Sequence, residues 1–256
     1  NVPAVRLLDD IGIDYSIEYL KKNGISTIVE SSDDSATNDE NLSALALGGM
    51  TRGISPIEMA SAYGTFPNGG VYVEPTTYTK VTDTQGNVLL EKTPEETQVY
   101  DEGVAFIMTS ILQSTVTDGI GHRAAIGIQP VGGKTGTTTD NYDAWFVGFT
   151  PQYAASVWIG NDVNMQLTSM SGPAAALWGK IMNQIPKAKK GHYKSQPSDV
   201  THVNGEYYTK GTESGRSTYF ADRAREAAQR KAAAAKKKAS SSKKSSHDDH
   251  DDDDDD

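Results

Sequence analysis

The stretch from residue 130 to residue 162, PVGGKTGTTTDNYDAWFVGFTPQYAASVWIGND, decides the fold of this chain. It begins with a glycine-rich segment, GGKTGTTTD at 132–140, which places one lysine and four threonine hydroxyls among three glycines. Two β patterns follow, at 143–151 and 153–162, because short apolar and aromatic runs bounded by turn residues are typical of strands. The glycine-rich segment is therefore a phosphate-binding loop, one wall of an acyl-transfer site on a sheet, or only a polar turn.

A phosphate-binding loop does not fit this segment. Such a loop has the pattern G-x-x-x-x-G-K-[ST] and opens a helix, whose backbone N–H groups hold the phosphates. Counting back from Lys134, the first glycine falls at position 128, which is Ile128, and Gly127 misses by one. A β pattern follows instead of a helix, so nucleotide binding is disfavoured.

The charge distribution argues against a nucleic-acid partner. The formal net charge of −10 depends on eight aspartates in residues 248–256; without them, 26 acidic side chains face 24 basic ones. The body is nearly neutral and has no basic stripe. Cysteine is absent, which excludes disulfides and thiolate metal sites, and no apolar run reaches the ~18–20 residues that cross a bilayer.

Apolar periodicity predicts the other elements. They are helices at 4–11, 14–24 and 101–118, a helix starting after Ser55, a strand pair within 71–92 that turns at 85–87, and a helix from Pro173 that stops at Pro186. We expect two apolar stripes to lie in the core: Val104, Ile107, Met108, Ile111, Leu112 and Val116 in the first helix, and Ala174, Leu177, Trp178, Ile181 and Ile185 in the second.

Some residues that suggest chemistry have simpler structural interpretations. Glu58 lies three residues after Ser55, the spacing of a capping box. His122 is interpreted as a loop residue, and Trp145, Phe146 and Trp158 as core and sheet packing.

The C-terminal part is expected to be different in character. Residues 189–256 are predicted to form a polar, largely disordered tail, with a lone helix at 222–238 that has no apolar face. Its acidic end contains His247 and His250, but without a folded cage we expect no specific metal site.

Residues 1 to about 185 resemble the transpeptidase domain of class A penicillin-binding proteins, the bifunctional peptidoglycan synthases. Five blocks carry the resemblance in family order: NVPAVRLLDDIGI, LALGGMTRGISPIEMASAYGTFPNGGVYVEP, ILQSTVTDGIG, PVGGKTGTTTDNYDAWFVGFTPQYAASVWIGND and ALWGKIM. The resemblance implies an α+β fold of the penicillin-binding and serine β-lactamase-like type, with an antiparallel sheet flanked by helices, over residues 1–188. The first strands and the helix with the nucleophilic serine are expected to lie upstream.

The resemblance also implies site residues. Asn1 matches the asparagine of the family's second motif, S-x-N, and Lys134, Thr135 and Gly136 match the third, K-T-G. Lys134 is expected to supply positive potential, and the hydroxyls of Thr135 and Thr137 to bind a substrate carboxylate. The N–H of Thr137 is expected to join an oxyanion hole. A side chain at position 136 would obstruct a substrate that lies along the strand. No cofactor is implied.

Several activities remain open on this fold. The leading one is a D,D-transpeptidase, whose partners are peptidoglycan stem peptides, both the D-Ala-D-Ala donor and the amine acceptor, and β-lactam antibiotics. It would act outside the cytoplasmic membrane, held there only through an upstream anchor. The alternatives are a D,D-carboxypeptidase, a serine β-lactamase and a non-catalytic β-lactam sensor. A deacylating E-x-x-L-N element is absent from residues 2–133, which disfavours a class A β-lactamase.

Overall fold

The computed structural model describes residues 1–33, 37–127, 130–213, 228–229 and 232. The helices, in chain order, are α1 (Val2–Ile11), α2 (Ile13–Lys22), η1 (Ser31–Asp33), α3 (Leu42–Leu47), α4 (Pro56–Gly64), α5 (Glu102–Thr117), η2 (His122–Ala124), η3 (Thr139–Asn141), α6 (Gly172–Gln184) and η4 (Pro186–Lys189). The strands are β1 (Val71–Val73), β2 (Lys80–Thr82), β3 (Val88–Glu91), β4 (Glu96–Gln98), β5 (Gly132–Thr137), β6 (Ala144–Phe149), β7 (Ala154–Ile159), β8 (Val200–Val203) and β9 (Glu206–Thr209).

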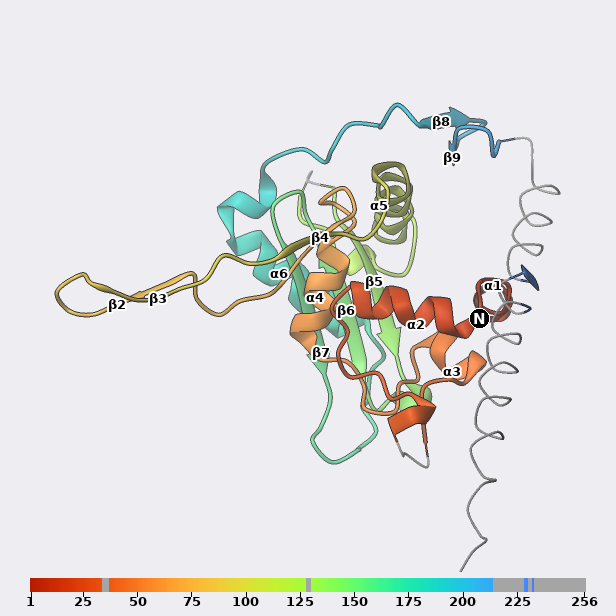
Figure 1. The fold of residues 1–256 in the computed structure, drawn as a ribbon, viewed down its shortest axis with the longest axis horizontal. Helices are drawn as coiled ribbons and strands as arrows, with labels where there is room; N and C mark the ends of the chain where they lie inside the picture. The colour runs from red at the N-terminus through yellow and green to blue at the C-terminus, as the bar shows by residue number, and fades with distance from the viewer. Residues whose placement is uncertain (34–36, 128–129, 214–227, 230–231, 233–256) are drawn as a thin grey trace, which may run out of the picture.

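An antiparallel sheet of three strands in the order β5-β6-β7 forms the centre of the molecule (Figure 1). Thr135 pairs with Phe146, and Phe146 pairs with Val157, so these three residues share one face of the sheet. Glycine is required at position 133, where a Cβ atom would lie 2.6 Å from the Phe146 ring and from the Val147 carbonyl oxygen. The predicted strands at 143–151 and 153–162 are confirmed.

Helix α6 covers this face of the sheet. Phe146 and Trp178 are fully buried, and their rings meet edge to face with centroids 5.3 Å apart. The Trp178 indole also donates to the carbonyl of Ala155 in β7, at 3.0 Å. This core aligns α6 with β6 and β7.

Helix α4 covers the opposite face. The hydroxyl of Ser156, whose side chain points away from α6, donates to the carbonyl of Pro56 at 2.6 Å. The start of α4 is a capping box between Ser55 and Glu58, as the sequence predicts. The sheet therefore lies between α6 and α4, and β5 is an edge strand of the sheet.

The first three helices form a smaller cluster. Helices α1 and α2 are separated at Gly12, which adopts φ 94°. Their apolar side chains pack with α3 around a buried group: Ile17, Ile25, Ile28 and Leu45. The predicted helices at 4–11 and 14–24 are confirmed.

The predicted strand pair at 71–92 is divided between two short sheets. β2 pairs with β3 in an arm that projects from the body (Figure 1), and its turn contains Gly86 at φ 87°. β1 pairs instead with β4, at residues 96–98, beyond the predicted range. The turn at 85–87 is confirmed, whereas the extent of the pair is corrected.

The prediction that two apolar stripes lie in the core is wrong for some of their residues. In α5, Val104 and Ile111 are 45% and 54% exposed, because α5 packs along β5 and β9 through another side. In α6, Leu177 and Ile181 are similarly exposed. The buried residues of α6 are Ala174, Ala175, Trp178, Gly179 and Met182. The small residues on this side let α6 pack closely against the sheet. Helical periodicity does not identify which of two apolar sides of a helix is the buried one.

The chain continues as an ordered segment after α6. β8 and β9 form a hairpin where the sequence predicts a polar tail, and the Phe106 and Tyr207 rings meet edge to face at 5.1 Å. The phenol of Tyr193 donates to the carbonyls of Pro130, at 2.9 Å, and Phe149, at 3.2 Å. A few aromatic contacts thus order a stretch whose composition is polar. The helix expected at 222–238 lies almost wholly outside the described residues, as do His247 and His250.

Within the described residues, no helix has the length and apolar character needed to cross a membrane. The same part of the chain contains no group of three or more histidine, aspartate or glutamate side chains arranged to hold a metal ion.

Candidate active site

Strand β5 presents a free backbone edge. The hydroxyl of Thr115 in α5 donates to the carbonyl of Gly133. In an antiparallel pair, the N–H and C=O of one residue point to the same side, and alternate residues point to opposite sides. The backbone groups of Thr135 and Thr137 therefore point to the same side as those of Gly133, away from β6.

Lys134 lies on the face of the sheet opposite Phe146. Its side chain is exposed, and its ammonium donates to the carbonyl of Thr135 at 2.8 Å. Among the described residues, this is the only hydrogen-bond acceptor of that ammonium. Lys134 thus places a positive charge directly beside the free edge.

The two threonines of this strand have different surroundings. Thr135 is only 7% exposed and shares the buried face with Phe146, whereas Thr137 is exposed at the end of the strand. This position gives Thr135 a packing role, and the predicted contact of its hydroxyl with substrate stays a prediction. The Lys134 ammonium and the backbone of Thr137 are better placed than the Thr135 hydroxyl to contact a substrate at the free edge.

Gly136 lies on the Lys134 face, paired with Trp145. A Cβ atom at this position would approach the Cβ of Trp145 at 3.3 Å, a tight but adjustable contact. The Trp145 ring is 6.4 Å from that of Trp158, which is 39% exposed. The core interpretation is therefore confirmed for Phe146, whereas Trp145 and Trp158 pack against each other on the sheet, on a face that α4 covers incompletely.

A tight turn ends β5. Asp143 joins its two sides: its N–H donates to the Thr138 hydroxyl at 2.8 Å, and its carboxylate accepts from that hydroxyl at 3.1 Å and from the Trp158 indole at 2.8 Å. Asp140 and Asn141 have positive φ angles of 61° and 58°. The structural roles of Asp143 and Thr115 were not predicted from the sequence. A threonine five residues before an aspartate across a turn is the signal for Asp143, whereas Thr115 has no local signal.

Among the described residues, no hydrogen bond or ion pair joins Asn1 to this edge. Asn1 is exposed at the start of α1, and its carbonyl accepts from the N–H of Val5 at 3.1 Å. Helix α1 packs against α2 and α3. No hydrogen bond joins Asn1 to Lys134 or Thr137, which are all described residues. Its expected role stays a prediction.

Glu58 and His122 have the surroundings that the sequence suggests. Glu58 accepts hydrogen bonds from Ser26 as well as Ser55, at distances from 2.6 to 3.1 Å. Partial burial raises the pKa of the Glu58 carboxyl, but these hydrogen bonds outweigh burial and lower that pKa to about 2. Glu58 thus has a structural role, and His122 lies exposed in η2.

An α+β domain with a K-T-G element on the edge of an antiparallel sheet defines the penicillin-binding and serine β-lactamase-like class. The chain belongs to the family described as penicillin binding protein transpeptidase domain, which matches residues 1–186. Its relatives include class A penicillin-binding proteins named 1A. The predicted family and fold are confirmed.

Individual relatives support this assignment. Penicillin-binding protein 1A of Clostridium botulinum is 40% identical over 206 residues, which are 80% of this chain and 24% of that protein. Penicillin-binding protein 4 of Bacillus subtilis is 34% identical over 180 residues, 70% of this chain and 28% of that protein. The crystal structure of penicillin-binding protein 1A from Haemophilus influenzae matches with a TM-score of 0.67 at 26% identity, over 83% of this chain and 38% of that one. The chain thus spans about a quarter of the length of the curated relatives it matches.

Proposed function

We propose that residues 1–188 form the C-terminal part of a peptidoglycan D,D-transpeptidase domain, which acts outside the cytoplasmic membrane and is acylated by β-lactams. The observation that carries the proposal is the free edge of β5, where the Lys134 ammonium and the outward backbone groups of Thr135 and Thr137 lie together. The nucleophilic serine and the membrane anchor are assigned to parts of the protein outside these 256 residues.

The free edge fits an extended peptide substrate. A D-Ala-D-Ala stem peptide can add to β5 as a further strand, with its main chain paired to Thr135 and Thr137. Its terminal carboxylate would meet the Lys134 ammonium, and ion pairs of this kind are stronger than neutral hydrogen bonds. Lys134 would then exchange the carbonyl of Thr135 for the substrate carboxylate.

The chemistry is acyl transfer in two steps. The serine hydroxyl loses its proton to a base and attacks the carbonyl between the two D-alanines, and D-alanine leaves with the proton. An amine on a second stem peptide then attacks the serine ester and restores the hydroxyl. The N–H of Thr137, which points away from β6, would donate to the oxyanion, and one such donor lowers the barrier by about 3 kcal/mol.

Labelling by a fluorescent penicillin tests this proposal. The full-length protein is expected to form a stable adduct that mass spectrometry places on a serine outside the 256 residues, and the isolated chain is expected to remain unlabelled. Labelling of the isolated chain would refute the assignment of the nucleophile.

Product analysis distinguishes the activities that share this fold. Incubation with a D-Ala-D-Ala peptide and an amine acceptor should release D-alanine and yield the amide. Release of D-alanine with water alone as acceptor would identify a carboxypeptidase, and rapid penicillin hydrolysis a β-lactamase. An adduct without peptide turnover would identify a sensor. Each of these three results would replace the transpeptidase proposal.

A further inference from the structure

A cavity elsewhere in the molecule is lined by none of the five predicted site residues. It has a volume of about 420 Å³, within the range of about 300–1,000 Å³ typical of small-molecule sites. Three parts of the chain form it: the loop after α4, one side of α5, and the segment from 193 to 207. Because the family match ends at residue 186, one wall of the cavity lies outside the matched domain.

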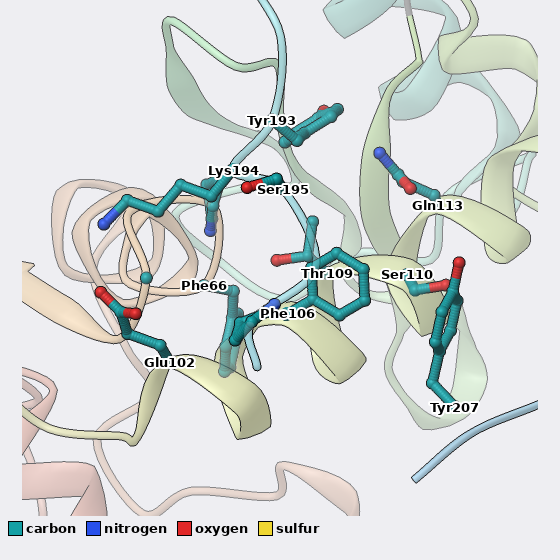
Figure 2. A pocket seen from close by; sticks show the side chains of 13 residues that line it. Phe66, Glu102, Phe106, Thr109, Ser110, Gln113, Tyr193, Lys194, Ser195 and Tyr207 are labelled. Carbon is teal, nitrogen blue, oxygen red and sulfur yellow. The ribbon is translucent and has the colours of Figure 1, made fainter. Parts of the chain in front are cut away.

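The two charged groups of the cavity lie together. Figure 2 shows the Glu102 carboxylate and the Lys194 ammonium at the same end. These two described groups do not form an ion pair with each other. The Lys194 ammonium donates to the carbonyl of Asn68 at 3.1 Å, and the Glu102 carboxylate has no hydrogen-bond or ion-pair partner among the described residues. This end offers one positive and one negative group to a ligand.

Away from the two charges, the cavity is lined first by aromatic rings and then by neutral polar side chains. Phe66 and Phe106 lie in the middle, and Ser110 and Tyr207 lie at the end opposite the charges (Figure 2). The hydroxyls of Ser110 and Tyr207 have no hydrogen-bond partner within the described part of the chain. The edge-to-face contact of Phe106 with Tyr207 fixes the wall between the two ends.

We propose that this cavity binds an α-amino-acid group, with its ammonium and carboxylate on one carbon, carried on an aliphatic stem. The ammonium meets Glu102, the carboxylate meets Lys194, and the aliphatic stem packs on the rings of Phe66 and Phe106. Ser110 and Tyr207 then bind the polar group at the far end of the ligand. Glu102 and Lys194 are both exposed at this end of the cavity, so each contributes through a charge-assisted hydrogen bond, and a ligand with only one of the two charges would lose one of these bonds.

Two sources carry this chemistry: a free amino acid, such as the D-alanine released by the proposed reaction, and a diamino acid side chain of a stem peptide. The cavity extends well beyond an amino acid of alanine size, which favours the longer diamino acid. The identification of the ligand as part of a stem peptide rests on the proposed function. The inference that the cavity binds an α-amino-acid group does not. The site is a second peptide contact, separate from β5.

Calorimetric titration of the full-length protein tests the proposal, after penicillin treatment that blocks the proposed active site. The probes are 2,6-diaminopimelate, heptanedioate without its amines, 1,5-diaminopentane without its carboxylates, and D-alanine. Diaminopimelate should bind, and each single-charge analogue should bind at least about tenfold more weakly. Weaker binding of D-alanine supports the diamino acid, and equal binding assigns the site to the free amino acid. No binding of diaminopimelate, or equal binding of the single-charge analogues, overturns the proposal.

Variants localise the binding. Glu102→Gln keeps the shape and removes the charge, and should weaken diaminopimelate binding by about tenfold. Ser110→Trp fills the cavity and should abolish binding. Glu96→Gln, an equivalent change of an exposed carboxylate outside the cavity, should have no effect. Unchanged binding by Glu102→Gln refutes the site. Penicillin labelling, followed by mass spectrometry in the same samples, reports separately on the proposed function.

Discussion

The hydroxyl of Thr115 in α5 donates a hydrogen bond to the backbone carbonyl of Gly133 in β5. This contact shows which side of β5 faces away from β6, and it ties the first half of the strand to a helix while the second half stays open. Lys134 and Thr137 therefore belong to a strand that is anchored at one end and accessible at the other.

Replacement of Thr115 tests this anchor. Thr115→Val removes the donor but keeps the branched shape, and we expect a loss of about 1 kcal/mol in the free energy of unfolding. Thr115→Ser keeps the hydroxyl and should retain most of that stability. Urea unfolding of both variants measures the difference. If the serine variant is the less stable of the two, packing of the methyl group, not the hydrogen bond, holds β5.

Lys134→Ala tests the proposed electrostatic role. Loss of a charged hydrogen bond to the substrate carboxylate should slow penicillin acylation of the full-length protein by about 10–100-fold, with little change in stability. Lys180→Ala, which removes an exposed lysine of α6, is the matched control. Stopped-flow acylation kinetics give both rates, and equal rates would exclude Lys134 from the site.

The two glycines of β5 should respond differently to alanine. Gly133→Ala forces a methyl group against the Phe146 ring and the Val147 carbonyl, so we expect about 1–3 kcal/mol of destabilisation. Gly136→Ala approaches only the Trp145 side chain, with the Cβ of Trp145 at 3.3 Å, and should change stability less. Because its methyl group lies on the Lys134 face, it should nevertheless slow acylation. Thermal unfolding and acylation rates together separate the two effects, and reversed stability effects would contradict the register of the sheet.

Glu58 should make the stability depend on pH in acid. The pKa of the Glu58 carboxyl is about 2 in the folded protein, against 4.5 for a free glutamate side chain. Between pH 2 and 4.5 the unfolded chain therefore binds more protons than the folded protein. The stabilisation is complete above about pH 4.5 and is lost as the pH falls towards 2. Glu58→Gln should lower the midpoint of thermal unfolding at pH 7, and its deficit should shrink steadily between pH 4.5 and 2. A deficit that is constant over this range would show that the charge of Glu58 does not contribute. Glu96→Gln serves as the control.

Local signals predicted much of this protein. The capping box at Ser55 and Glu58 acts within a few residues of chain and is present in the structure. The predicted break between the first two helices is also local, and it falls at Gly12 with φ 94°. The strands β6 and β7 were also predicted, because short apolar and aromatic runs bounded by turn residues are typical of strands. The K-T-G element together with the surrounding blocks identified the family.

Tertiary structure decided what depends on contacts between distant parts of the chain. Which side of α6 is buried depends on Trp178 reaching Phe146 and Ala155, and periodicity alone selected Leu177 and Ile181 instead. The separation of Thr135 from Lys134 onto opposite faces, and the cavity around Glu102 and Lys194, also depend on such packing. The sequence by itself thus determined the elements and the family, because these follow from local backbone preferences and motif spacing. Packing alone determined which side chains remain available for chemistry, because burial is a property of the assembled layers.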